Sequence, residues 1–300
     1  MELKKAVRKK GKLKMGLSGT SGSGKTYSAL LLAHGITNDW NKVAVIDTEN
    51  ASAQLYSQLG GYATIDLQQP FSPERYIEAI RACEAGGIEV CIIDSISHEW
   101  DGKGGCLEIQ EKLGGRYQDW AKVTPRHNNF IESILQSPMH VITCVRRKQD
   151  YDMTKDSSGK IKVEKAGLKE VTREGFEYEL TLNMNIETNH FATASKDRTG
   201  LFMDKPSFVI SQDTGKTILN WCNSGQAATT AKPASGMKDV YMAFLNNNKH
   251  LMSNGDDKLF TKNIDTWDAA TYDKALDRVK GIFAKRESDL LHAEETNKLR

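Results

Sequence analysis

The chain has 300 residues, of which 39% are hydrophobic and 27% are charged, and its formal net charge is +2 at pH 7. This length allows one large α/β domain with a small appendage, or two modest domains. No apolar run approaches the roughly 20 residues that a membrane span needs. A net charge this close to zero neither indicates nor excludes a polyanionic partner.

The sequence lacks the features of a secreted or disulfide-rich protein. Its basic N-terminal stretch has no apolar core of the kind that a secretory signal needs. Five cysteines are spread along the chain without a C-x-x-C pair: Cys83, Cys91, Cys106, Cys144 and Cys222. We therefore expect a cytoplasmic protein with reduced thiols and no membrane partner, and neither a zinc site nor a disulfide framework is indicated.

The first half of the chain alternates apolar strands with helices. Strands are expected at 12–18, 43–47, 90–94 and 141–145, and helices at 27–34, 73–84 and 116–136. Pro125 is expected to kink the last helix or split it in two. This alternation predicts an α/β fold with a mainly parallel, twisted sheet flanked by helices.

The second half is less regular. Residues 151–165 are polar and contain a turn at 156–159, which indicates a loop or an exposed hairpin, and 176–186 and 190–195 are expected to be later strands of the same sheet. An Ala/Thr/Pro/Gly-rich stretch at 227–236 is typical of a linker. It divides a predicted core, 1–226, from a small helical C-terminal segment, 237–300.

Residues 19–26 read GTSGSGKT, which is the G-x-x-x-x-G-K-[ST] phosphate loop. A strand before it and a helix after it supply the context that this motif requires. Backbone N–H groups of the loop and the helix N-terminus would bind a phosphate, Lys25 would reach the β- and γ-phosphates, and Thr26 would coordinate Mg²⁺. We therefore predict that the chain binds Mg²⁺ and ATP through the loop and the residue after it: Gly19, Thr20, Ser21, Gly22, Ser23, Gly24, Lys25, Thr26 and Tyr27.

The strand at 90–94 ends in an acid, as the second nucleotide-binding motif of such proteins requires. Asp94 would stand at the carboxyl end of a buried strand, beside the Mg²⁺ of the nucleotide, and would hold that ion together with Thr26. The residue after it is Ser95 rather than the glutamate that many P-loop ATPases use to activate water. The catalytic acid is therefore expected elsewhere.

Glu49, just past the strand at 43–47, is the leading candidate for that acid. Asp47 lies one step earlier and is better placed to shape the turn. His98 and Glu99 are the rivals of Glu49, and a structural capping role for Glu49 is the remaining alternative. A carboxylate at this position could accept a proton from the attacking water.

At this point the chain resembles a known family. VAVIDTENASAQLYSQLG at 43–60 is similar to the RecA-type segment that carries the catalytic glutamate, and IIDS at 92–95 is similar to the RecA-type strand ending in Asp-Ser. The run DSISHEW at 94–100, followed by a Gly-rich loop, resembles the phage-encoded RecA-like ATPases of the Sak-type single-strand annealing family. The resemblance covers about residues 10–225 and does not reach the C-terminal tail.

The resemblance implies a RecA-like ATPase, stimulated by single-stranded DNA, that works as a ring or filament in the cytoplasm, or in the host cytoplasm if it is phage-encoded. A single-strand DNA-binding protein is a candidate partner. Lys196 and Arg198, in SKDRTG at 195–200, resemble the basic finger that RecA-like proteins place on a neighbouring subunit's γ-phosphate. A charged hairpin turn is the alternative for these residues. Arg146 stands where the family often has a glutamine that senses the γ-phosphate. The resemblance therefore does not identify the residue that has this role here.

The resemblance also places DNA-facing loops at 99–115 and 146–165. The first loop offers Trp100 for stacking and Lys103 for phosphates, and the second offers the cations Arg146, Arg147 and Lys148 together with the aromatic Tyr151. Aromatic and cationic side chains together are typical of sequence-tolerant single-strand binding. Ordinary packing of Trp100 and a solvated surface around 146–148 are the alternatives.

Three functions remain open from the sequence. The leading one is an ATPase in phage recombination, annealing or repair that hydrolyses Mg-ATP with Glu49 as the base. The second is a nucleotide-gated DNA-binding scaffold with negligible hydrolysis. The third is a P-loop kinase or regulatory ATPase without a DNA role.

Overall fold

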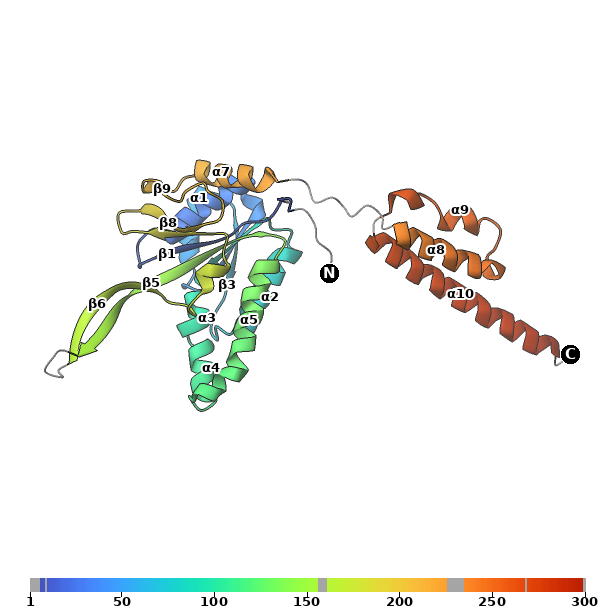
Figure 1. Cartoon of the computed structure of the whole chain (residues 1–300), viewed down its shortest axis with the longest axis horizontal. Helices are drawn as coiled ribbons and strands as arrows, with labels where there is room; N and C mark the ends of the chain where they lie inside the picture. The colour runs from blue at the N-terminus through green and yellow to red at the C-terminus, as the bar shows by residue number, and fades with distance from the viewer. Residues whose placement is uncertain (1–5, 9, 156–160, 226–234, 268, 299–300) are drawn as a thin grey trace. The chain divides into compact units, whose positions relative to one another are not determined.

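The computed structural model describes residues 6–8, 10–155, 161–225, 235–267 and 269–298 (Figure 1). They fall into two compact units, Lys10–Gly225 and a helical C-terminal unit. Each unit is described by itself. The predicted linker lies for the most part outside the described residues, and a helix already begins at its penultimate position, Ser235.

The larger unit is built on one mixed sheet. Its strands are β1 (Lys14–Gly19), β2 (Val43–Asp47), β3 (Ala63–Asp66), β4 (Val90–Asp94), β5 (His140–Lys155), β6 (Ile161–Glu170), β7 (Leu182–Ile186), β8 (Phe191–Asp197) and β9 (Phe208–Val209). The order is β3-β2-β4-β5-β1-β7-β8-β9, and β6 pairs only with β5. The first six strands of this order are parallel, and β8 and β9 are antiparallel additions. This confirms the predicted α/β fold with a mainly parallel sheet.

The register brings the predicted motifs together at the carboxyl ends of the parallel strands β1, β2 and β4. Gly19 at the end of β1 lies level with Arg146 of β5. Asp94 at the end of β4 lies level with Asp47 of β2. Because β5 is inserted between β1 and β4, a cleft can form beside Arg146, between the phosphate loop and the acidic strand ends.

Helices cover both faces of this sheet (Figure 1). On one face, α1 (Lys25–Thr37) and α7 (Gln212–Asn223) pack over a core that includes Met15, Leu17 and Val45. On the other face, α2 (Pro73–Ala85) and α5 (Trp120–Gln136) pack over the alternate side chains of the same strands. β2 and β4 are apolar up to their final aspartate because both of their faces are buried.

Of the two outcomes predicted at Pro125, a kink or a split of the helix, the split is wrong, because α5 runs through this residue. A proline in a helix removes one hydrogen bond, and the packing of Val123 and Phe130, both fully buried, offsets that loss. A short 3-10 turn, η3 (Tyr117–Asp119), precedes the helix.

Two further segments differ from the sequence prediction. The stretch 176–186 is not one strand: Phe176–Glu179 forms the short helix α6, and only the rest enters β7. The stretch 99–115 is not a loop, since it lies mostly in α3 (Ser97–Asp101) and α4 (Cys106–Lys112). The sequence prediction also missed β3 and the 3-10 segments η1 (Trp40–Lys42) and η2 (Ser52–Leu59). Residues 151–155 and 161–165 pair as antiparallel strands of β5 and β6, which agrees with the hairpin, the second of the two predicted alternatives; the predicted turn at 156–159 lies outside the described residues.

The C-terminal unit has a small core of its own. It contains α8 (Ser235–Asn247), η4 (Lys249–Leu251), α9 (Asp256–Phe260), η5 (Ile264–Thr266) and α10 (Ala269–Lys298). Tyr241, Leu245, Phe260 and Phe283 are among its buried side chains. None of the helices that the structure describes is long and apolar enough to cross a membrane.

Candidate nucleotide site

The phosphate loop is shaped by two glycines with left-handed backbone angles. Gly22 has φ +78° and Gly24 has φ +89°, a region that side chains with a Cβ rarely adopt. α1 begins directly afterwards, at Lys25. The Lys25 ammonium group donates to the carbonyl oxygens of Gly19 (3.1 Å) and Thr20 (2.8 Å), and so lies over the loop that it is expected to serve.

The first turn of α1 faces the acidic end of β4. The Thr26 hydroxyl donates to Asp94 Oδ2 at 2.5 Å. Burial raises the pKa of Asp94 to about 6, against the opposing hydrogen bond from Thr26, because a charge in this position loses its water. A hydroxyl and a buried carboxylate that lacks a cationic partner in contact suit a Mg²⁺ ion. Ser23 Oγ, inside the loop, is buried with no hydrogen-bond partner among the described residues, as a donor to a phosphate would be.

Glu49 reaches this cleft from the turn after β2. Asp47 shapes that turn, as the sequence predicted, because its carboxylate accepts from the backbone N–H groups of Glu49 (2.6 Å) and Ala53 (2.7 Å). The Glu49 carboxylate accepts from Arg146 Nε at 2.8 Å. The Arg146 backbone N–H donates in turn to the hydroxyl of Ser97 at 2.9 Å.

The two rivals of Glu49 do not line the cleft. Glu99 is 1% exposed and is held by His127 and Cys106 on the side of the sheet that α5 covers. His98 is half-buried, with its Nδ1 2.8 Å from Thr48 Oγ1. Its ring stacks on Phe71, and burial lowers its pKa.

The cleft has a volume of about 520 Å³, which suits a nucleotide-sized ligand. Its lining residues are Ser21, Gly22, Gly24, Lys25, Thr26, Tyr27, Ser28, Glu49, Ser52, Leu55, Tyr56, Asp94, Arg146, His190, Val209 and Ile210. Tyr27 and Tyr56 form a tilted ring pair 5.7 Å apart, beside the exposed side chains of Leu55 and Val209. This apolar rim can contact a base, whereas the loop side contacts phosphates.

Sequence reasoning missed several of these residues. His190 Nδ1 lies 3.1 Å from the Ser23 carbonyl oxygen, and the imidazole packs against the Gly24 Cα. Tyr56, Leu55 and Val209 come from η2 and β9, which carry no motif. The aromatic Tyr27 directly after the loop was the one signal that a base-binding rim exists.

Lys196 and Arg198 lie at the opposite end of the strands from the phosphate loop. In β8, Lys196 pairs with Asn183 near the start of β7, whereas the phosphate loop is level with the end of β7. The Lys196 ammonium group donates to the carbonyl oxygens of Glu177 (2.9 Å) and Tyr178, and Arg198 donates to Tyr178 as well. Neither side chain lines the cleft of its own chain.

Three of the five predicted DNA-binding residues, Trp100, Arg146 and Lys148, are paired with other side chains. Trp100 stacks on Trp120, with ring centroids 5.4 Å apart. Arg146 belongs to the nucleotide cleft, because it pairs with Glu49. Lys148 pairs with Asp101 at 2.7 Å.

The other two predicted DNA contacts are Lys103 and Arg147. The exposed Lys103 stands between α3 and α4, and its carbonyl oxygen accepts from the Phe71 N–H. Arg147 donates through Nη2 to the Leu168 carbonyl oxygen, and its Nε has no partner among the described residues. The side chain of Tyr151 lies outside what the structure describes.

A glycine-shaped phosphate loop, a buried acid at the neighbouring strand end and a cleft between them define a P-loop nucleotide-binding protein. Residues 11–220 match the family model of an AAA domain. The chain therefore belongs to this AAA-domain family of P-loop ATPases.

No sequence among the curated proteins matches the chain. Among solved structures, a KaiC-like protein from the hyperthermophilic archaeon Pyrococcus horikoshii OT3 is similar to it. The two are 16% identical, with 69% of this chain and 97% of that chain covered and a TM-score of 0.40. Such a similarity carries no inference about function.

Proposed function

We propose that the chain is a Mg²⁺-dependent ATPase that acts on single-stranded DNA in recombination, annealing or repair. One observation carries the hydrolytic part: of the three candidate acid–base residues, Glu49, His98 and Glu99, Glu49 alone lines the cleft that also holds Lys25, Thr26 and Asp94. Glu49 would take the proton of the attacking water, and Lys25 would stabilise the charge that develops on the γ-phosphate.

Thr26 and Asp94 would hold the Mg²⁺ of the nucleotide, which neutralises phosphate charge when bound. Arg146 has two roles in this proposal. Its guanidinium group would orient the Glu49 carboxylate, and it stands level with Gly19 at the end of β1, where it could approach a γ-phosphate. It would thus replace the sensor glutamine of the RecA-like family.

The proposal includes an assembly in which the basic finger works in trans. Lys196 and Arg198 lie at the end of the strands that is away from their own cleft. In this arrangement the basic finger would contact the nucleotide of a neighbouring copy only. The exposed apolar rim around Leu55 and Val209 would then face that neighbour. A ring or a filament satisfies this geometry equally well.

The DNA contacts are proposed on the side of the β5–β6 hairpin. Arg147 and Lys148 lie at its base, where Arg147 pairs with Glu170 in the register of β5 and β6 and Lys148 is exposed. The stacked pair Trp100 and Trp120 lines a second hollow that also contains Arg173. Cationic and aromatic side chains are the groups with which proteins bind single strands without sequence preference.

A scaffold with negligible hydrolysis is the second candidate, and the ion pair of Glu49 with Arg146 favours it. The Glu49 carboxylate is held by Arg146 at 2.8 Å, so turnover would be slow until the pair separates and the carboxylate can contact the attacking water.

The test is steady-state ATP hydrolysis by the full chain with and without single-stranded DNA, alongside fluorescence anisotropy of a labelled strand at several salt concentrations. DNA-stimulated turnover and salt-dependent binding support the ATPase. Nucleotide-dependent DNA binding without turnover supports the scaffold. No DNA binding at low salt, with or without nucleotide, overturns the DNA role.

A further inference from the structure

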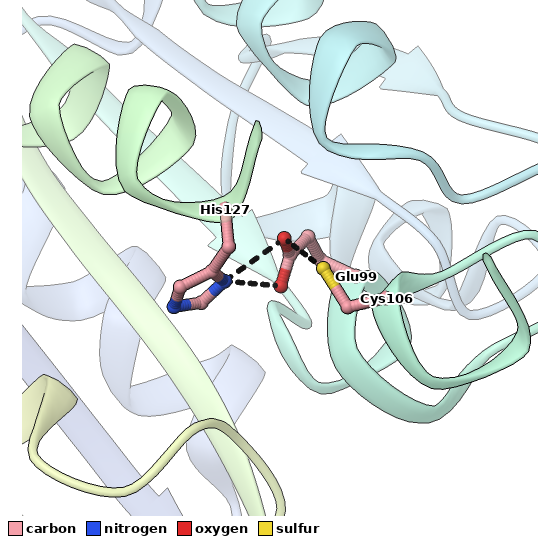
Figure 2. Close-up of side chains that lie close together, drawn as sticks. All are labelled: Glu99, Cys106 and His127. Carbon is pink, nitrogen blue, oxygen red and sulfur yellow. Dashed lines mark hydrogen bonds and ion pairs between the residues drawn. The ribbon is translucent and has the colours of Figure 1, made fainter. Parts of the chain in front are cut away.

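The strongest unassigned feature is a buried cluster of three metal-ligating side chains, Glu99, Cys106 and His127 (Figure 2). We propose that these residues form a Zn²⁺ site, separate from the nucleotide cleft. The carboxylate of Glu99 lies between the other two side chains, as Figure 2 shows. The three residues belong to three consecutive helices, α3, α4 and α5, so the ion would tie these helices together.

The distances match a preformed site. His127 Nδ1 lies 3.0 and 3.1 Å from the two Glu99 oxygens, and Cys106 Sγ lies 3.0 Å from Glu99 Oε1. The donor atoms of all three residues lie within 4.8 Å of one another. Neighbouring ligands of a tetrahedral Zn²⁺ ion stand about 3.4 Å apart, given metal–ligand distances of about 2.0–2.3 Å. Small side-chain movements would therefore admit the ion.

The donor set selects the metal. A thiolate favours Zn²⁺ over Mg²⁺ or Ca²⁺, and imidazole and carboxylate are both ordinary Zn²⁺ ligands. One thiolate and one carboxylate balance the two charges of the ion, which matters because the three side chains are 0–4% exposed. The described residues supply three donors, so water completes the coordination. His127 also borders a hollow of about 410 Å³, which gives a route for entry.

The backbone between Glu99 and Cys106 is built to bring the two together. Gly105 N–H donates to the Gly102 carbonyl oxygen at 2.8 Å, which closes a tight turn. A Cβ on Gly105 would stand 2.7 Å from the carbonyl oxygens of both His98 and Glu99. A larger residue would therefore push the Cys106 thiol away from the Glu99 carboxylate.

Without metal, the cluster is a hydrogen-bonded triad. Burial and the neighbouring Glu99 raise the pKa of the Cys106 thiol well above its ordinary value, so the thiol is protonated and donates to the carboxylate. Binding of Zn²⁺ releases this thiol proton to solvent and leaves a thiolate on the ion. In the metal-free triad His127 donates its Nδ1 proton to the Glu99 carboxylate. To bind the ion through Nδ1, the imidazole would lose that proton to solvent and take one on Nε2, so that it stays neutral.

The test uses the full chain after treatment with a chelator, titrated with Co²⁺ in the absence of nucleotide. One equivalent of Co²⁺ should bind and produce the thiolate-to-cobalt charge-transfer band in the near ultraviolet, and Zn²⁺ should remove that band. Cys106→Ser should lose the band, and Cys222→Ser is the matched control that keeps it. Asp94→Asn should also keep it, which separates this site from the nucleotide cleft and from the proposed ATPase activity.

His127→Gln provides a second variant in case Cys106→Ser does not fold, with circular dichroism as the check. It should weaken Co²⁺ binding at least tenfold while the thiolate band persists at saturation. The proposal is overturned if wild-type protein gives no thiolate band at one equivalent. It is equally overturned if the band survives in folded Cys106→Ser, or if folded His127→Gln binds Co²⁺ as tightly as wild type.

Discussion

At the scale of single residues, the buried charge of Asp94 lowers the stability of the nucleotide-free protein, and the same charge is needed for the proposed binding of Mg²⁺. The Asp94 carboxyl is 1% exposed, and burial raises its pKa from 3.8 to about 6. The native state therefore binds this proton more tightly than the unfolded chain does, and the free energy of unfolding falls as the pH rises from about 4 through about 6. At neutral pH, the full cost of a buried charge is present in the nucleotide-free protein.

Asp94→Asn should therefore stabilise the nucleotide-free protein at pH 7 by about 2–3 kcal/mol, because the amide keeps an acceptor for Thr26 and carries no charge. Denaturant unfolding at pH 7 measures the gain. Mg-ATP binding should be lost in the same variant. A less stable variant at pH 7 would show that the carboxylate is not strained by burial.

The residues that a motif specifies could be predicted, and those that only the fold brings together could not. Lys25, Thr26 and Asp94 follow from the phosphate loop and the acidic strand end. His190 and Tyr56 reach the cleft from segments whose local pattern says nothing about nucleotides. Glu99 illustrates a second difficulty, because its place in the sequence next to His98 does not show which face of α3 it occupies.

At the scale of elements, α1 and α7 pack unusually closely. A Cβ on Gly35 would stand 2.0 Å from the Gln212 carbonyl oxygen, and a Cβ on Gly215 would stand 2.4 Å from that of Leu32. Both neighbours are backbone atoms, so the helices themselves would have to separate.

Gly35→Ala should destabilise the larger unit by about 1–3 kcal/mol, despite the better helix propensity of alanine. Urea unfolding followed by circular dichroism measures this change. Gly281→Ala in α10 is the control, because a Cβ there meets nothing within 4 Å. Equal effects of the two substitutions would contradict the close packing of α1 on α7.

The start of β5 contains a pH-sensitive contact. His140 is 3% exposed, its Nδ1 accepts from the Leu13 N–H at 3.0 Å, and burial lowers its pKa from 6.5 to about 3, with Lys12 and Lys14 adding to the effect. The unfolded chain therefore binds more protons between these two values, and stability is lost as the pH falls from about 6.5 towards 3.

His140→Asn retains an acceptor for Leu13 but does not titrate. Between pH 6 and pH 4, the wild type should lose roughly 2 kcal/mol more stability than this variant, since one proton changes the slope by about 1.4 kcal/mol per pH unit. Chemical unfolding at a series of pH values gives both slopes. Parallel slopes would mean that His140 is protonated in the native state.

Strands and helices with a strong period could be predicted within a few residues, as β2 and β4 were. The failures have physical causes. Residues 176–186 alternate apolar and polar side chains from end to end, which is the period of a strand, so the local pattern does not distinguish α6 from the strand that follows it. In the Gly-rich stretch at 99–115, tertiary packing of Cys106 and Trp100 stabilises two short helices that propensity alone does not favour.

At the scale of the whole molecule, the proposed assembly predicts that two impaired variants regain activity when they are mixed. Lys196→Ala should leave nucleotide binding intact and reduce ATPase activity, and Lys25→Ala should lose both. A mixture of the two proteins should regain activity, because a Lys25→Ala copy still offers a finger to the intact cleft of a Lys196→Ala copy. Hydrolysis in mixtures of varied ratio measures this. No recovery on mixing would argue against a finger in trans.

The central claim is that Glu49 activates the water, and Glu49→Gln tests it most directly. The amide retains the shape and a hydrogen-bond acceptor for Arg146 but cannot take a proton. The variant should bind Mg-ATP about as well as the wild type and lose hydrolysis by about 10²–10⁴-fold. The exposed Glu111→Gln is the matched control and should hydrolyse normally. Unchanged hydrolysis in folded Glu49→Gln would remove this residue from the role and contradict the proposed mechanism.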